Sequence, residues 1–267
     1  MNMRPRIVRF LILIAIAINS SVVIYAQAFS PTPAKAVATL LLKSGTVFEL
    51  ALPASRIEEL AKVASKPGGT KVVGDELARL NLPNEILEDT FARILIVQGR
   101  VPEREAEGWM RRLSGVDGFR AAMRKSMGAS DANTIGHLNE VRIADWAVQA
   151  NFKVRGIGVR FKDPNKVNPT DIDVLLERRG QLIAIEAKAY PSDGAIDLVK
   201  FRADMVSLVE YQAAHPSQDV VKVFSITNKP ANPDTWKLLQ SSADQHKVEL
   251  LVGSPEELLH QLSILLR

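Results

Sequence analysis

The chain has 267 residues, enough for one large domain or two small ones, and its 46% hydrophobic and 24% charged residues are typical of a folded globular protein. It contains no cysteine, which excludes disulfide bonds, cysteine-based zinc sites and thiol catalysis. The net charge of +4 is uneven: residues 1–28 hold 3 Lys/Arg and no acids, whereas residues 137–267 hold 16 Lys/Arg and 17 Asp/Glu. The C-terminal half is therefore not basic, and charge alone does not indicate nucleic-acid binding.

Residues 1–28 have the three parts of a secretory signal peptide. A leader with three arginines precedes a short apolar core over residues 10–18, and an Ala-Gln-Ala cleavage site ends at Ala28. The alternative is an uncleaved membrane anchor over residues 10–26, although polar residues 19–21 interrupt it. Both alternatives place the rest of the chain outside the cytoplasm. We therefore expect an exported protein, periplasmic or secreted, without stable membrane insertion if the signal is cleaved.

Residues 29–130 are predicted to form a mostly helical α+β domain of unknown role. Apolar runs at residues 37–42 and 47–52 flank a polar turn and predict a hairpin. Ser55 and Glu58 have the spacing of a capping box, which predicts that a helix begins there. Apolar residues with helical spacing predict three further helices, at residues 84–98, 102–113 and 117–127.

Basic residues gather near the end of this region. They fit either a solvated helix face or contacts to nucleic-acid phosphates, and the sequence leaves both open. The cluster consists of Arg111, Arg112, Arg120, Arg124 and Lys125.

From residue 131 the predicted elements follow a regular order, and we expect a second domain over residues 131–267. Its longest helix is expected to pack through Ile196, Val199, Ala203, Val206 and Val209. In chain order the expected elements are a helix at 134–150, strands at 152–161, 170–177 and 181–188, a helix at 194–214, a strand at 220–227, a helix at 233–246, a strand at 248–252 and a helix at 254–266.

Charged residues interrupt two of these otherwise apolar strands. Alternate strand residues point to the same face, so Glu186 and Lys188 share a side, as do Asp171 and Asp173. Burying such charges is costly unless they pair, bind a metal ion or face a wet cleft. A polar turn at residues 178–180 joins the two strands. The hairpin is predicted to place an Asp of one strand beside Glu186 and Lys188 of the other.

This hairpin resembles the PD-(D/E)xK nuclease superfamily, the restriction-endonuclease-like and Holliday-junction-resolvase-like enzymes. The superfamily pattern is an Asp on one strand and a Glu-x-Lys on the next, matched here by Asp173 or Asp171 and by Glu186-Ala187-Lys188. The order helix, three strands, helix, strand over residues 134–227 is also similar. The resemblance implies an α/β fold class with a restriction-endonuclease-like αβββαβ core and a C-terminal helix-strand-helix extension.

The resemblance also implies a Mg²⁺ ion, with Mn²⁺ as a substitute, held by oxygen ligands. Asp173, Glu186 and the backbone carbonyl of Ala187 would be ligands. Asp173 is favoured over Asp171 because it lies deeper in its strand. Lys188 would activate water or stabilise the transition state, and the sequence does not choose between these roles. On the preceding helix, Glu140 either completes the metal site or is a solvated surface residue.

The implied function is an exported, Mg²⁺-dependent phosphodiester hydrolase. It would be an endonuclease that binds nucleic acid, with DNA as the expected substrate, and many enzymes of this fold are homodimers. The alternative is a catalytically inactive restriction-endonuclease-like interaction module at the cell envelope. Asp145 reads as an ordinary surface residue. Gly-x-Ser-x-Gly, a Walker loop, a dinucleotide fingerprint and His-Glu-x-x-His are all missing from the sequence.

Overall fold

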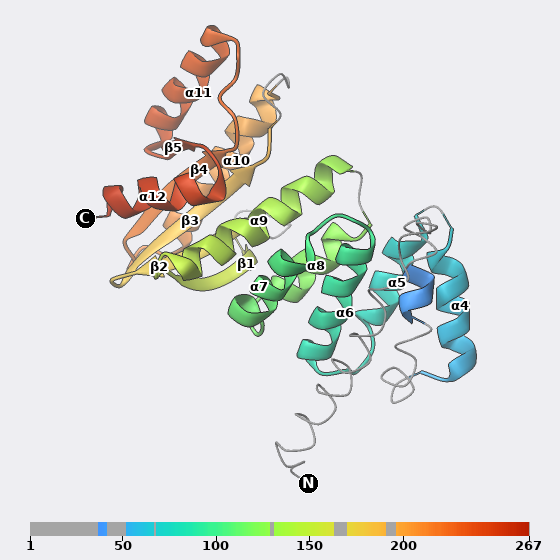
Figure 1. Cartoon of the computed structure of the whole chain (residues 1–267). Helices are drawn as coiled ribbons and strands as arrows, with labels where there is room; N and C mark the ends of the chain where they lie inside the picture. Colours follow the sequence, from blue (N-terminus) through green and yellow to red (C-terminus); the bar gives the residue numbers. More distant parts are fainter. Residues whose placement is uncertain are drawn as a thin grey trace.

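The computed structural model describes residues 37–41, 52–66, 68–128, 131–162, 170–190 and 196–266. Figure 1 shows a helical N-terminal region beside a mixed α/β part built on a five-stranded sheet. The predicted leader, residues 1–28, lies outside the described residues. Within the described ranges, no helix is long and apolar enough to cross a membrane.

The helices predicted for the N-terminal region are present. Asn84–Val97 (α6), Glu103–Leu113 (α7) and Phe119–Ser126 (α8) match the three expected ranges closely. Before them lie Ala54–Ala64 (α4) and Gly69–Leu77 (α5). The sequence did not predict α5. Gly68 and Gly69 at its start, followed by Gly74 within it, are typical of a loop.

The predicted hairpin at the start of this region is wrong for its first arm. Residues 37–41 are helical. Val37 and Leu41 are both buried, and a spacing of four residues places them on one face of a helix. The second arm, at residues 47–52, lies almost entirely outside the described residues.

The capping box predicted at Ser55 is also wrong. The N-cap of α4 is Pro53, which makes no side-chain capping bond. A capping box occurs instead in front of Pro255–Leu265 (α12), where Ser254 and Glu257 each bond the other's backbone N–H. Two helix starts can carry the same residue pattern, and the spacing alone does not tell which of them will use it.

One sheet contains five strands, in this order across it: Lys153–Phe161 (β1), Thr170–Arg178 (β2), Gln181–Lys188 (β3), Val220–Ile226 (β4) and Glu249–Val252 (β5). The pairs β1–β2 and β2–β3 are antiparallel, whereas β3–β4 and β4–β5 are parallel. The parallel connections run through Leu198–Ala214 (α10) and Pro233–His246 (α11), because parallel neighbours need a crossover. All five predicted strands of this part are confirmed within a few residues.

The β2–β3 hairpin turns through two residues. Arg179 and Gly180 have φ values of +53° and +83°. Positive φ at both central positions is the geometry that matches the twist of paired strands in the tightest hairpins, and glycine adopts it without strain. The turn fixes the register, with Arg178 opposite Gln181 and Val174 opposite Ile185.

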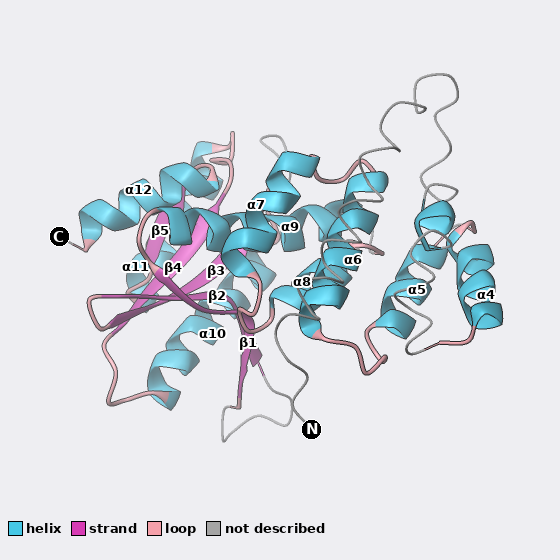
Figure 2. Ribbon diagram, turned by 60° about the horizontal axis from the view of Figure 1, so that its bottom comes forward, coloured by secondary structure: helices cyan, strands magenta, loops and turns pink. Residues whose placement is uncertain are grey.

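Helices cover both faces of the sheet (Figure 1, Figure 2). Asp131–Gln149 (α9) and α12 contribute to the apolar core on one face, whereas α10 and α11 contribute to a second apolar cluster on the other face. The first core also contains residues of the N-terminal helices, such as Phe91 and Trp109. One apolar core therefore contains residues from both sides of the domain boundary that the sequence suggested.

Helix α10 packs through a different side from the one that the sequence suggested. Val199 is 79% exposed and Val206 is 38% exposed, whereas Phe201 and Met205 are fully buried. Both sides of this helix are apolar, and the side with the larger residues buries more apolar surface. This orientation brings Asp204, next to Met205, to the sheet.

Candidate active site

The predicted site forms where strands β2 and β3 separate. Their ladder ends at Val174 and Ile185, although β3 goes on pairing with β4 as far as Lys188. Beyond the end of the ladder, Asp173 Oδ2 accepts a 2.8 Å hydrogen bond from the backbone N–H of Ala187. The side chain of Asp173 therefore lies in the opening between the strands.

Lys188 lies among three carboxylates in this opening. Its Nζ is 3.1 Å from Glu186 Oε2, 3.5 Å from Asp173 Oδ2 and 3.2 Å from Asp204 Oδ2 on α10. None of the four side chains is more than 20% exposed. Three carboxylates and one ammonium give a formal charge of −2, so these four groups do not neutralise one another.

Burial and the neighbouring charges shift the proton equilibria of this cluster. Burial, followed by the charge of Asp173, raises the pKa of Glu186 well above its ordinary value. Burial lowers the pKa of Lys188, but the carboxylates of Asp173, Glu186 and Asp204 together outweigh burial, and the net shift raises this pKa. The Lys188 side chain is therefore a protonated cation at neutral pH.

Glu140, on α9, belongs to the surroundings of this cluster. It is only 8% exposed, and its Oε1 lies 3.0 Å from His137 Nδ1. Burial raises the pKa of Glu140, the hydrogen bond with His137 opposes the shift, and the charge of Asp173 adds to it. The alternative of a solvated surface glutamate is therefore wrong, whereas the structure does not test metal ligation by Glu140.

The two aspartates of β2 have different environments. Asp171 is exposed and lies opposite Arg160 on β1, whereas Asp173 is half-buried within the cluster. Ala187 lies between the two charged residues of β3, and its side chain is buried in the core of the α9 face. The geometry thus brings together Asp173, Glu186 and Lys188 and leaves Asp171 outside.

Sequence reasoning missed Asp204. This residue follows Phe201 by three positions and precedes Leu208 by four, so it lies within the buried stripe of α10. An acid within such a stripe is a signal of the same kind as Glu186 within an apolar strand. The sequence hides this signal because Val199 and Val206 form a second apolar stripe on the other side of α10.

The donor atoms of the cluster fit a hard divalent cation in chemistry and charge. Such ions prefer carboxylate oxygens, and the excess charge of −2 is the charge that one divalent ion offsets. Asp204 Oδ2 is buried without a hydrogen-bond partner. In the described part of the chain, however, no three His, Cys, Asp or Glu side chains are already arranged as a metal site. The carboxylates are directed at the ammonium of Lys188 instead.

An ion pair between buried Asp145 and partly exposed Arg112 lies elsewhere on α9, and it corrects the prediction for Asp145. This residue is 6% exposed, not a surface residue. Arg112 of α7 donates to both of its oxygens, at 2.7 and 2.9 Å, and Gln149 donates a third hydrogen bond of 2.9 Å. Two parallel Arg–carboxylate bonds are among the strongest polar contacts in proteins.

Other members of the basic cluster also have partners within the protein. Arg120 of α8 donates to Asn84 Oδ1 at 2.6 Å, and Arg124 pairs with Asp75 of α5. These contacts join α8 to two other helices. For Arg120 and Arg124, these contacts favour a structural role over contacts to nucleic-acid phosphates.

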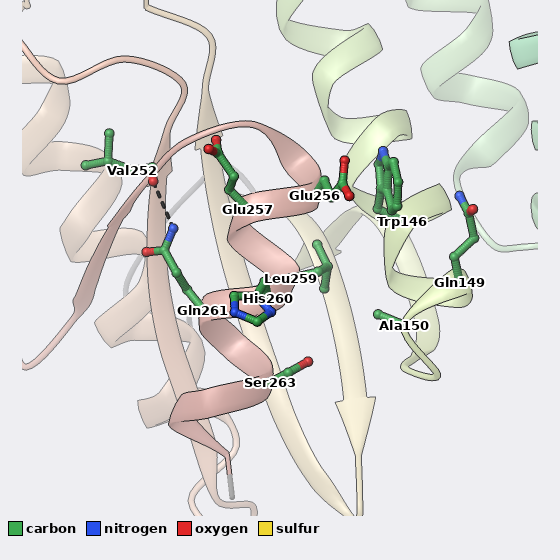
Figure 3. Close-up of a pocket in the computed structure, with 10 residues that line it drawn as sticks. All are labelled: Trp146, Gln149, Ala150, Val252, Glu256, Glu257, Leu259, His260, Gln261 and Ser263. Carbon is green, nitrogen blue, oxygen red and sulfur yellow. Dashed lines mark hydrogen bonds between the residues drawn. The ribbon is translucent and has the colours of Figure 1, made fainter.

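An open cleft of about 550 Å³ lies between α9 and α12, as Figure 3 shows. Trp146, Gln149 and Ala150 line one side, and residues of α12 line the other. Two of the lining residues are joined to each other, because Gln261 of α12 donates a hydrogen bond of 2.9 Å to the carbonyl of Val252, the last residue of β5. The cleft shares no lining residue with the charged cluster, so it is not the place of the predicted chemistry.

Comparisons with known proteins find similarity among solved structures. No family profile and no curated protein matches the chain. Among solved structures, Can2 from Sulfobacillus thermosulfidooxidans, in complex with cyclic tetra-adenylate (cA4), is similar at 13% identity and a TM-score of 0.37. The match covers 89% of this chain and 57% of the Can2 chain. A TM-score of this size does not establish a shared fold, and the family of this chain stays a proposal.

Proposed function

We propose that this protein is a metal-dependent nuclease of the PD-(D/E)xK type that hydrolyses phosphodiester bonds, with DNA as its expected substrate. The observation that carries the proposal is the opening between β2 and β3, where Asp173, Glu186 and Lys188 meet. The elements from α9 to β4 follow the order of the superfamily, and the single Glu-x-Lys of this chain lies at the end of β3. Both observations support the proposal.

Asp173 and Glu186, together with the carbonyl of Ala187, would hold a Mg²⁺ or Mn²⁺ ion, and Glu140 is the candidate for a further ligand. When bound, the ion would neutralise charge on the phosphate and activate a water for in-line attack. The excess negative charge of the cluster supports binding of a divalent cation.

Lys188 would stabilise negative charge as it develops on the phosphate. Because its carboxylate neighbours outweigh burial and raise its pKa, Lys188 donates hydrogen bonds at neutral pH and is poorly suited to remove a proton. Of the two roles that the sequence left open, we favour electrostatic stabilisation and orientation of the water.

The proposal includes export, because the predicted signal sequence would direct the enzyme to the periplasm or the medium. Export would also separate a nuclease from the genome of the cell that makes it. A homodimer is compatible with the proposal, and light scattering of the purified protein would measure it.

The first experiment incubates the purified mature protein, starting near Gln27 or Phe29, with linear, circular and single-stranded DNA and with RNA. Reactions contain Mg²⁺, Mn²⁺ or EDTA, and Lys188→Ala is the control. Metal-dependent cleavage that the variant has lost would establish the nuclease and identify its polymer. If folded wild-type protein cleaves none of these polymers, or if Lys188→Ala retains full activity, the proposal is wrong.

A second candidate function is an inactive interaction module that keeps the fold. One observation favours it: the carboxylates are directed at Lys188, and no metal-site arrangement exists among the described residues. A thermal shift with Mn²⁺ distinguishes the candidates. Stabilisation that disappears in Asp173→Asn and Glu186→Gln supports the nuclease, and no stabilisation at all supports the module.

A further inference from the structure

Asp204 approaches Lys188 from a different element than the other two carboxylates. Asp173 and Glu186 belong to the β2–β3 opening, whereas Asp204 belongs to α10. The buried side chains of Phe201, Met205 and Leu208 hold α10 against the sheet. Asp204 is thus a fixed acceptor, 3.2 Å from Lys188 Nζ.

The contacts of Lys188 create a conflict with metal binding. Two of its three carboxylate partners, Asp173 and Glu186, are also the proposed metal ligands. If those two were its only partners, the ammonium and the metal ion would compete for the same oxygens. The carboxylate of Asp204 gives the ammonium a partner outside the proposed ligand set of the sequence motif.

Asp204 has capacity for this role. Its Oδ2 is buried and lies at ion-pair distance from Lys188, but it makes no hydrogen bond in the present arrangement. A small movement of the flexible lysine side chain toward α10 would form that bond and release Glu186. A buried carboxylate that keeps an unused acceptor costs free energy, and the movement would recover part of that cost.

We propose that Asp204 is a positioning residue, which holds the ammonium of Lys188 on the α10 side so that Asp173 and Glu186 can take a divalent cation. The inference rests on the proposed metal-dependent nuclease and adds a residue that the motif does not contain.

A double-mutant cycle on the purified mature chain tests this role. Mn²⁺ affinity is measured by calorimetry for the wild type, Asp204→Asn, Lys188→Met and the double variant. Asp244→Asn, an exposed acid on α11, is the matched control for loss of one negative charge. Circular dichroism confirms that each variant is folded.

We expect Asp204→Asn to weaken Mn²⁺ binding about 10-fold, within the range of coupling between residues in contact. In the Lys188→Met background the same substitution should have little effect, because no ammonium then competes for the ligands. Cleavage by Asp204→Asn should recover at high Mn²⁺ concentration, whereas cleavage by Lys188→Met should not.

The outcomes separate the inference from the proposed function. Equal weakening in both lysine backgrounds would show that Asp204 acts only through its charge, or as a ligand itself, and would overturn the positioning role while leaving the nuclease intact. Coupling without cleavage by the wild type would support the positioning role and contradict the nuclease. A wild type that neither binds Mn²⁺ nor cleaves would overturn both.

Discussion

Two clusters of charge in the described part of the chain, one buried and one partly buried, are built differently. In the first, Arg112 and Asp145 carry equal and opposite charges, and both carboxylate oxygens accept hydrogen bonds. In the second, Lys188 faces three carboxylates, and Asp204 keeps one oxygen without a hydrogen bond. Burial of charge is therefore common to a contact that joins two helices and to the proposed active site.

The difference lies in the balance of charge and of hydrogen bonds. An ion pair whose two groups satisfy each other has no net charge and no free hydrogen-bonding capacity for a ligand. Its disruption leaves an uncompensated charge. A cluster with excess carboxylate charge stores electrostatic free energy that a cation can release. Four predictions test whether this distinction holds, in order of expected effect.

Lys188→Met should lower the cleavage rate by about 10²–10⁴-fold, the range for a positioned side chain that acts on the transition state. Its stability should fall less than its activity, because Glu186, whose pKa burial and Asp173 already raise, can hold a proton when the ammonium is gone. Single-turnover cleavage and urea unfolding are measured on the same preparation. A variant that cleaves at the wild-type rate would assign Lys188 to structure alone.

Arg112→Met should show the opposite behaviour. It leaves the Asp145 carboxylate buried with Gln149 as its remaining partner, and we expect a loss of about 3 kcal/mol in the free energy of unfolding. Urea unfolding measures the loss, and activity per folded molecule should stay at the wild-type level. If the variant does not fold, Arg112→Lys keeps the charge without the paired bonds and should lose less. If both Arg112→Lys and Arg112→Met unfold at the wild-type midpoint, the pair of Arg112 and Asp145 does not stabilise the fold, and the proposed difference between the two clusters is wrong.

The pH dependence of stability should reveal the free-energy cost of ionising Glu186, which arises from burial and then from the charge of Asp173. Because the folded protein raises the pKa of Glu186, it retains a proton that the unfolded chain releases. The contribution of Glu186 to the free energy of unfolding should be fully present below the ordinary pKa and should be lost as pH rises through the raised pKa. Glu186→Gln removes this contribution, which corresponds to about 1.4 kcal/mol for each pKa unit.

The measurement compares urea unfolding of the wild type and Glu186→Gln at several pH values in EDTA. Glu140 also titrates, but it is present in both proteins and cancels in the difference. Curves that remain parallel from acidic to neutral pH would show that the pKa of Glu186 is not raised in the folded protein.

Asp171→Asn should have the smallest effect. Asp171 is exposed and outside the cluster, so we expect stability within about 0.5 kcal/mol of the wild type and an unchanged cleavage rate. Asp173→Asn is the matched variant on the same strand and should abolish cleavage. A loss of cleavage in Asp171→Asn with retention in Asp173→Asn would reverse the assignment of the ligand.

The sequence predicted the sheet well and the N-terminal region less well. Strands β2 and β3 have apolar runs at residues 174–176 and 182–185 on either side of a short polar turn, and this pattern specifies both their extent and their register. The apolar run at residues 37–41 shows no comparable signal of strand or turn that fixes its conformation. It is helical because Val37 and Leu41 pack into a core that the local pattern does not reveal. Local sequence does not contain the shape of that core.

The site was predictable where charge interrupts a strand and less so where charge interrupts a helix. Glu186 and Lys188 stand out because every other strand residue should be apolar on a buried face. The face of α10 was ambiguous, since Val199 and Val206 offered an apolar stripe as regular as that of Phe201 and Met205. Only packing against the sheet decides between the two stripes, and that decision brings Asp204 to Lys188.

The hydrogen bond from Ala187 to Asp173 links the site to the exchange of a single amide proton. This N–H is held by a side chain where an ordinary ladder would use a backbone carbonyl. A ligand that captures the Asp173 carboxylate leaves that amide without its partner, and the proton becomes free to exchange with solvent. The backbone at Ala187 would therefore report occupancy of the site, even in a variant that performs no chemistry.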